Sequence, residues 1–208
     1  MDQWFVNIDH NSFRNKALAA IDSVNWVPGW GRNRIEGAVQ SRPDWCISRQ
    51  RSWGVPIPAF YDAQGEPILD ARIVRNTADL VQEHGSNVWF ERELADLWAA
   101  VKPDDWDGAE AIGKSTDTLD VWIDSGSSSR AVLMQRSELG RPGAEAGTPD
   151  AWQADYYLEG SDQHRGWFQS SLLLSLAGNG VAPYRNVLTH GFMVDADREK
   201  ISKSKQDG

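Results

Sequence analysis

Residues 155–189 place a helical pattern between two short apolar runs, and this order limits the possible folds more than any other feature of the chain. Residues 155–158 (Asp-Tyr-Tyr-Leu) and 186–189 (Asn-Val-Leu-Thr) are predicted strands, and residues 165–177 are a predicted helix that ends at Gly178. Two strands joined through a helix pair in parallel, by a right-handed crossover. The sequence therefore predicts an α/β fold with a parallel sheet.

Small and polar residues follow each predicted strand of this part of the chain. A third strand is predicted over 119–123 (Leu-Asp-Val-Trp-Ile), and the polar clusters that follow the three strands are residues 124–127, 159–162 and 190–191. Ligands of open parallel sheets bind beyond the carboxyl ends of the strands. We therefore expect the three clusters to line one binding site.

The first 118 residues combine helical patterns with short extended runs. Four helices are predicted in this part of the chain. The first covers about 13–24, with Asn11 or Ser12 as its cap, and the second covers about 32–40. The third starts from a cap at Thr77 and ends at Gly85, and the fourth covers 90–101. Short extended pieces are predicted over 45–48 and 55–60. Residues 61–118 are predicted to form a small separate α+β module, which divides the chain into 1–60, 61–118 and 119–208.

The composition excludes several classes of protein. The single cysteine, Cys46, excludes an internal disulfide framework and favours a cytoplasmic location, and the four histidines have no metal-ligand spacing, so no bound metal is predicted. No apolar run reaches the roughly 20 residues of a membrane-spanning helix, and the chain does not start with a secretory signal. The net charge of −9 indicates that any nucleic acid is held mainly outside this chain.

The densest polar cluster is residues 159–168, Glu-Gly-Ser-Asp-Gln-His-Arg-Gly-Trp-Phe. A glycine lets a ligand approach the backbone closely, and a carboxylate just beyond a strand can accept hydrogen bonds from an ammonium group or from ribose hydroxyls. The helix that follows offers free amide groups to an anion. The competing interpretation is that Asp162 only caps this helix.

A second candidate motif is Lys-Ile-Ser-Lys-Ser at residues 200–204. Its ammonium groups and hydroxyls suit a polyphosphate, although a basic pentapeptide alone is more commonly a solvated tail. The sequence contains neither GxxxxGK[ST] nor GxGxxG, which excludes a P-loop and a standard dinucleotide site.

Taken together, these motifs resemble the class I aminoacyl-tRNA synthetases, and within them the isoleucyl-tRNA synthetases. Residues 200–204 are similar to the KMSKS signature, with Ile201 in place of methionine, and residues 42–56 (RPDWCISRQRSWGVP) resemble the stretch where that family's chain re-enters the catalytic core after its editing insertion. The runs 119–127 and 157–168 favour the isoleucyl branch over the valyl and leucyl branches. The resemblance implies the second half of a Rossmann-like parallel sheet, with residues 1–60 re-entering the core and residues 61–118 inserted as the small module.

The resemblance also implies the reaction and its residues. The implied substrates are isoleucine, Mg-ATP and tRNA(Ile), with Mg²⁺ entering as part of the ATP complex. The isoleucyl-adenylate would contact Glu159, Gly160, Asp162, Gln163, His190 and Gly191. Trp122 and Trp167 would wall the isoleucine pocket, although either tryptophan alone is more commonly plain core. Lys203 would hold the ATP phosphates and Lys200 would assist it, as the catalytic residues.

The sequence departs from the family pattern in two places. The HIGH motif is missing, since no His-x-x-His occurs in the chain, and Lys205-Gln206 replaces the family's usual small residues. We therefore expect a fragment of a longer ligase, inactive alone, whose exposed sheet edge favours self-association. The alternative is a non-catalytic module that binds an adenylate or a partner protein.

Overall fold

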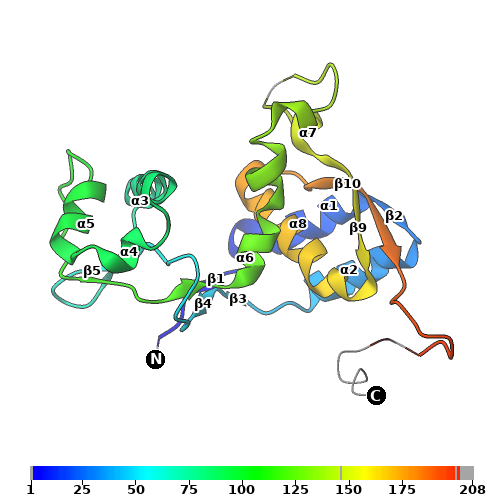
Figure 1. Cartoon of the computed structure of the whole chain (residues 1–208), viewed down its shortest axis with the longest axis horizontal. Helices are drawn as coiled ribbons and strands as arrows, with labels where there is room; N and C mark the ends of the chain where they lie inside the picture. Colours follow the sequence, from blue (N-terminus) through cyan, green and yellow to red (C-terminus); the bar gives the residue numbers. More distant parts are fainter. Residues whose placement is uncertain (1, 146, 200, 202–208) are drawn as a thin grey trace. The chain divides into compact units, whose positions relative to one another are not determined.

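A computed structural model describes residues 2–145, 147–199 and 201 of the chain (Figure 1). Its contacts divide the chain into two compact units. Unit 1 consists of Met1–Phe5 and Cys46–Asp120, and unit 2 consists of Val6–Trp45 and Val121–Gly208. The short strands β1 (Phe5–Val6) and β3 (Trp45–Cys46) lie where the chain passes between the units. The division into 1–60, 61–118 and 119–208 stays a prediction.

Unit 2 is built on a parallel sheet of three strands in the order β2-β10-β9. The strands are β2 (Asn25–Val27), β9 (Ala154–Gly160) and β10 (Tyr184–His190), and helix α8 (Trp167–Asn179) joins β9 to β10. The predicted α/β fold with a parallel strand–helix–strand unit is thus confirmed. The remaining elements of unit 2 are η1 (His10–Ser12), α1 (Phe13–Asp22), α2 (Trp30–Gln40), α6 (Val121–Gly126), η2 (Ser129–Leu133), η3 (Ser137–Leu139), α7 (Pro149–Trp152) and η4 (Ser161–Arg165).

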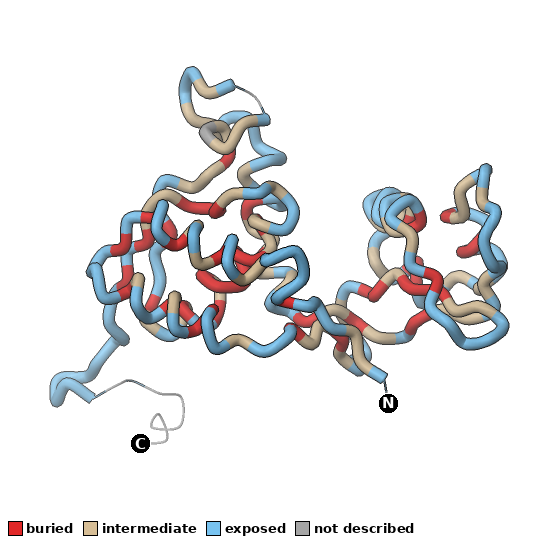
Figure 2. Tube along the Cα trace, turned by 180° about the vertical axis from the view of Figure 1, so that it is seen from behind, coloured by how far each residue is buried: buried red, intermediate tan, exposed pale blue. Residues whose placement is uncertain are grey.

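One face of this sheet forms the core of unit 2, seen in red in Figure 2. Trp26, Val187 and Tyr157 stand in register across the three strands, and all of them are buried. The Trp26 indole donates to the carbonyl of Ile21 in α1, and the Tyr157 ring stacks on Trp167 of α8 with 4.1 Å between the ring centroids. Helices α1 and α8 therefore cover this face of the sheet through contacts with Trp26 and Tyr157.

The opposite face of the sheet carries a second row in register, made of Val27, Leu188 and Leu158. These side chains belong to residues that are 40%, 37% and 55% exposed, and Tyr156 beside them is 63% exposed. Parallel sheets normally bury both faces. The exposed apolar row is therefore an unusual surface in the part of the chain that the structure describes.

Residues 119–123 do not form the predicted strand. Strand β8 (Thr118–Leu119) ends before Asp120, and Val121 begins helix α6. Helix α6 approaches α8 so closely that a Cβ added to Gly126 would lie 2.7 Å from the Cδ1 atom of Leu174. The polar cluster at 124–127 consequently lies at the end of a helix rather than beyond a strand, which corrects that prediction.

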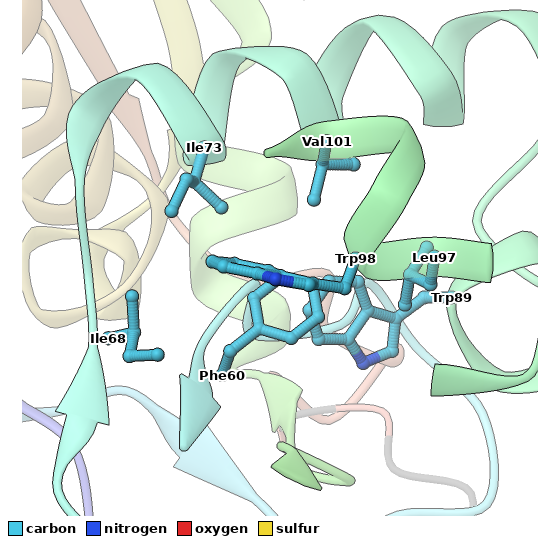
Figure 3. Packing of buried hydrophobic residues seen from close by; sticks show 7 residues of the cluster. All are labelled: Phe60, Ile68, Ile73, Trp89, Leu97, Trp98 and Val101. Carbon is cyan, nitrogen blue, oxygen red and sulfur yellow. The ribbon is translucent and has the colours of Figure 1, made fainter. Parts of the chain in front are cut away.

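Unit 1 encloses an aromatic core between small antiparallel sheets and three helices. Its elements are β4 (Ser48–Arg49), β5 (Phe60–Tyr61), β6 (Pro67–Ile68), α3 (Ala71–His84), α4 (Val88–Glu91), α5 (Leu94–Val101), β7 (Gly113–Lys114) and β8, with strand pairs β6-β5-β7 and β4-β8. Figure 3 shows the core cluster, which consists of Phe60, Ile68, Ile73, Trp89, Leu97, Trp98 and Val101. The Phe60 ring lies between two tryptophans, with centroids 5.0 Å from Trp89 and 4.9 Å from Trp98.

Several helix boundaries differ from the prediction. Helix α3 begins at Ala71, because the Asp70 carboxylate accepts a hydrogen bond from the Arg72 amide at 2.7 Å, whereas the Thr77 hydroxyl lies inside the helix and donates to the Ile73 carbonyl. The helix predicted over 90–101 is two helices, α4 and α5. At α1 the Ser12 side chain makes no capping hydrogen bond.

None of the helices in the described ranges is long and apolar enough to cross a membrane.

Candidate functional site

The strands β9 and β10 end side by side, which brings together residues from two predicted clusters. Glu159 pairs with Thr189 and Gly160 pairs with His190 in the parallel register, and Gly191 follows directly. The Glu159 and His190 side chains are half exposed, and His190 Nε2 lies 3.6 Å from Glu159 Oε1. Both groups therefore face the region beyond the carboxyl ends of the strands.

The Glu159 carboxylate is held by the backbone that follows it. Its Oε1 atom accepts a hydrogen bond from the Gly160 amide at 2.8 Å. An ionised carboxylate has about four acceptor positions, so this contact leaves capacity for a ligand. The Asp162 carboxylate folds back over Gly160, where an added Cβ would lie 2.9 Å from Asp162 Oδ1. A side chain at position 160 would therefore crowd the Asp162 carboxylate.

Gln163 links the turn η4 to helix α8. Its Oε1 atom accepts from the Trp167 amide at 2.9 Å, and its Nε2 atom donates to Asp162 Oδ2 at 3.1 Å. The amide of Gln163 thus holds the first turn of α8 and orients Asp162. In the described structure Gln163, and not Asp162, supplies the side-chain acceptor at the start of α8.

Trp122 and Trp167, the two tryptophans predicted to wall the isoleucine pocket, both adjoin Gly166: Trp122 lies against it in space, and Trp167 follows it in the chain. A Cβ added to Gly166 would lie 2.9 Å from the Cη2 atom of Trp122, a residue that is 41% exposed. The Trp167 indole donates to the Ser125 carbonyl at 2.9 Å and to the Ser128 hydroxyl at 3.0 Å. Trp167 is therefore fixed between Tyr157 and α6, while the Trp122 ring stays partly open to solvent.

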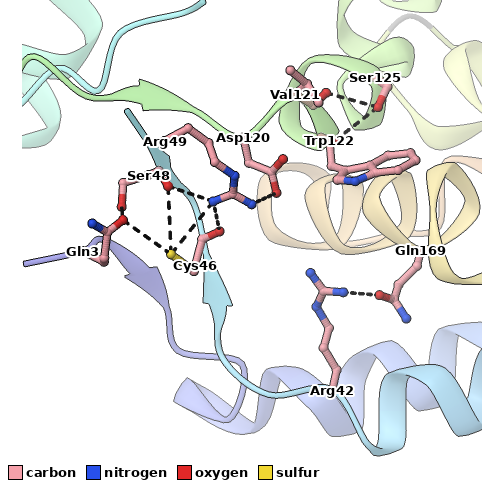
Figure 4. Close-up of polar contacts among 10 residues, drawn as sticks. All are labelled: Gln3, Arg42, Cys46, Ser48, Arg49, Asp120, Val121, Trp122, Ser125 and Gln169. Atoms are coloured by element: carbon pink, nitrogen blue, oxygen red, sulfur yellow. Dashed lines mark hydrogen bonds and ion pairs between the residues drawn. The ribbon is translucent and has the colours of Figure 1, made fainter. Parts of the chain in front are cut away.

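Residues 42–56, the stretch that resembles the family's re-entry segment, make polar contacts within each unit, and Figure 4 labels several of the residues involved. In unit 1 Arg49 donates to the Cys46 and Ser48 carbonyls at 2.9 and 2.8 Å, and it forms an ion pair of 2.9 Å with Asp120, whose side chain is 6% exposed. In unit 2 Arg42 donates to the Gln169 side chain and lies 4.9 Å above the Trp45 ring. These arginines join distant segments within each unit.

Lys200 and Lys203 lie outside the described residues. Over residues 2–145, 147–199 and 201, no three His, Cys, Asp or Glu side chains gather closely enough to hold a metal ion. Sequence reasoning did not single out His164, a buried residue inside the predicted cluster. The only sequence signal for this burial is the position of His164 three residues after Ser161. The rings of Trp26 and Trp30 that pack against His164 come from elements distant in the sequence.

Comparison with known proteins defines the class to which this site belongs. The profile of the tRNA synthetases class I (I, L, M and V) matches residues 1–208. The chain therefore belongs to the class I tRNA synthetase family.

Within this family the chain is similar to isoleucine–tRNA ligases. It is 52% identical over 204 residues to that of Geobacter sulfurreducens (98% of this chain, 21% of that protein). It is 55% identical over 205 residues to that of Methylacidiphilum infernorum (97% and 20%). The chain thus spans about a fifth of the length of these relatives.

One solved structure that the chain matches is a leucyl-tRNA synthetase of Agrobacterium radiobacter K84, in a ternary complex with tRNA and LeuAMS. It matches 78% of this chain and 21% of that chain, at 21% identity and a TM-score of 0.47.

Proposed function

We propose that the chain supplies part of the adenylate-forming site of an isoleucine–tRNA ligase, a cytoplasmic enzyme of protein synthesis. The observation that carries the proposal is the meeting of Glu159, Gly160, Asp162 and His190 at the carboxyl ends of β9 and β10, where parallel sheets bind ligands. Identities of 52% and 55% to isoleucine–tRNA ligases support isoleucine as the amino acid. The proposed partners are isoleucine, Mg-ATP and tRNA(Ile), with the main tRNA contacts outside this chain.

The proposed reaction joins isoleucine to AMP. A carboxylate oxygen of isoleucine attacks the α-phosphorus of ATP, the new C–O–P linkage forms, and the bond to the bridging oxygen of pyrophosphate breaks. A hydroxyl of the terminal ribose of tRNA then attacks the acyl carbon of the adenylate, which forms the ester, breaks the bond to the phosphate oxygen and releases AMP. Catalysis of this kind depends on positioning and on stabilisation of charge.

We assign the positioning of the substrates and the stabilisation of charge to different residues. Glu159 accepts hydrogen bonds from the ammonium group of isoleucine, and Asp162 and Gln163 hold the adenylate. Trp122 and Trp167 wall the isoleucine side chain, and His190 and Gly191 lie beside the adenine. Lys203, assisted by Lys200, neutralises the phosphates, and Mg²⁺ arrives bound to ATP.

Calorimetric titration with a non-hydrolysable isoleucyl-adenylate analogue tests this proposal, and the valyl analogue is its control. One methylene in an apolar pocket is worth about 1–3 kcal/mol, so the isoleucyl analogue should bind roughly 10- to 150-fold more tightly. Equal affinities, or no binding by a chain shown to be folded, would contradict the proposal.

The chain alone is not expected to catalyse isoleucine-dependent exchange between ATP and pyrophosphate. The family's HIGH motif supplies histidines to the triphosphate, and no His-x-x-His occurs in these 208 residues. Exchange above background by the purified chain would contradict this expectation.

We also propose that the chain self-associates through β9, an outer strand of the sheet, and the apolar row Val27, Leu188 and Leu158. Light scattering should show dimers or larger species. Leu158→Lys should shift the population to monomers, whereas Leu139→Lys, at a residue 43% exposed outside the sheet, should not. A monomeric unsubstituted chain would contradict the proposal.

A further inference from the structure

His164 is fully buried although its neighbours in η4 are the proposed adenylate-binding residues Asp162 and Gln163. The imidazole lies among the rings of Trp26, Trp30 and Phe168, with centroid distances of 6.1, 5.7 and 5.2 Å. These rings come from β2, α2 and α8. His164 is therefore the point at which η4 is packed into the core of unit 2.

The hydrogen bond of His164 fixes its tautomer. Nδ1 lies 2.9 Å from the Ser161 carbonyl oxygen, which can only accept, so Nδ1 carries the proton and the neutral ring leaves Nε2 as an acceptor. Nε2 is buried and has no hydrogen-bond partner among the described residues. A Cβ added to Gly31 of α2 would lie 3.0 Å from this atom.

The surroundings favour the neutral ring. Burial lowers the pKa of His164 below its ordinary value of 6.5, and the positive charge of Arg34 lowers it further, against the opposing effects of the Ser161 carbonyl and the Asp162 carboxylate. Arg34 on α2 and Asp162 on η4 are the charged groups that act on the ring, while β2 and α8 present the uncharged Trp26 and Phe168. A proton on Nε2 would meet no acceptor among the described residues.

We infer that His164 is a positioning residue: its neutral imidazole closes the η4 turn through Ser161 and seats that turn against Gly31 of α2. The seated turn holds Asp162 and Gln163 at the carboxyl end of β9. What the turn then binds rests on the proposed function, whereas the seating itself is a property of the chain without ligand.

Amide hydrogen exchange of the unliganded chain tests the seating directly. His164→Phe keeps a ring but loses the donor, and exchange of the η4 amides should rise about tenfold, as expected for the loss of one buried hydrogen bond. His164→Asn places an amide donor at the Nδ1 position and should restore most of the protection. Exchange in β9 and β10 should stay unchanged in both variants, which separates the effect from general unfolding.

Two variants of α2 provide a matched pair that leaves the imidazole intact. Gly31→Ala crowds Nε2 and should raise η4 exchange, whereas Gly37→Ala, with nothing within 4 Å of the added Cβ, should not. Unchanged exchange of the η4 amides in both His164→Phe and Gly31→Ala would overturn the inference. Exchange of the η4 amides that is as fast in His164→Asn as in His164→Phe would also overturn it.

The pH dependence follows from the direction of the pKa shift. The folded pKa of His164 lies below 6.5, so the open turn binds a proton more readily than the closed turn. Protection of η4, corrected for the intrinsic exchange rate, should therefore fall as the pH drops below 6.5, and His164→Phe should abolish this dependence. A pH dependence that persists in His164→Phe would count against the inference.

The isoleucyl-adenylate analogue then separates this inference from the proposed function. Its affinity should fall about tenfold in His164→Phe and recover in His164→Asn. If η4 exchange responds as described but the unsubstituted chain does not bind the analogue, the positioning role stands and the proposed function fails.

Discussion

Replacing Trp98 with alanine is expected to lower the free energy of unfolding of unit 1 by about 3–5 kcal/mol. Trp98 is 5% exposed, and its ring packs edge-on against Phe60 and Trp106, with centroids 4.9 and 5.8 Å away. Its indole also donates to Glu110 Oε2 at 2.6 Å. The substitution opens a cavity at the centre of the cluster in Figure 3.

Urea denaturation followed through the indole resonance of Trp89 measures this loss, because Trp89 belongs to the same cluster and its indole donates to the Ser115 carbonyl. Trp98→Phe keeps an aromatic ring but loses the hydrogen bond, so its loss should be smaller. Trp53→Ala provides the matched control: Trp53 is 82% exposed in the same unit, and the expected change is below about 0.5 kcal/mol. Equal losses at Trp98 and Trp53 would contradict the prediction.

Glu159→Gln is expected to weaken the binding of an isoleucyl-adenylate analogue by about 10- to 100-fold, since hydrogen bonds to charged groups contribute about 1.5–3 kcal/mol. Glutamine keeps the size of the side chain and one carbonyl oxygen, which can still accept from the Gly160 amide as Glu159 Oε1 does. The substitution therefore removes the negative charge that the proposed role requires and leaves the local backbone in place.

Calorimetric titration with two ligands separates the effect of this charge on ligand affinity from its effect on the fold. An analogue that lacks the α-amino group should bind Glu159→Gln and the unsubstituted chain with similar affinity, because it offers no ammonium group. Glu138→Gln, which removes the charge of an exposed carboxylate paired with Arg136, should leave both affinities unchanged. Equal losses for the amino and desamino analogues would contradict the proposed contact with the ammonium group, because Glu159 would then act on a part that both analogues share, such as the ribose hydroxyls, or through the fold.

The central strand–helix–strand unit could be predicted because its signals are local and agree with one another. β9 and β10 are seven-residue strands with apolar centres, and the 13 residues of α8 end at Asn179, which is followed by Gly180 in a left-handed conformation. The meeting of Glu159 and His190 follows from this topology, since parallel strands end at the same edge of a sheet. The sequence therefore predicted where these two side chains lie, while their roles remain proposals.

The failures have equally specific causes. The run 119–123 is short, apolar and rich in β-branched residues, and such runs cannot be assigned to helix or strand by periodicity. Helix α6 forms there against α8, at a distance that Gly126 permits. The three residues of β2 are too few for a pattern. The seating of His164 depends on Gly31, which is far from it in the sequence, so this contact has no local sequence signal. The contact of Gln163 with the Trp167 amide is local, but it was not predicted because Asp162 was the candidate cap.

The order of strands in unit 2 has a consequence for synthesis. β10 lies between β2 and β9 in the sheet, yet it is the last of the three to be made. β9 ends at Gly160, and the ribosome must add the 23 residues 161–183 before it reaches Tyr184 at the start of β10. At about 5–20 residues per second this interval lasts roughly 1–5 s. During that time the nascent chain carries both outer strands without the neighbour they share.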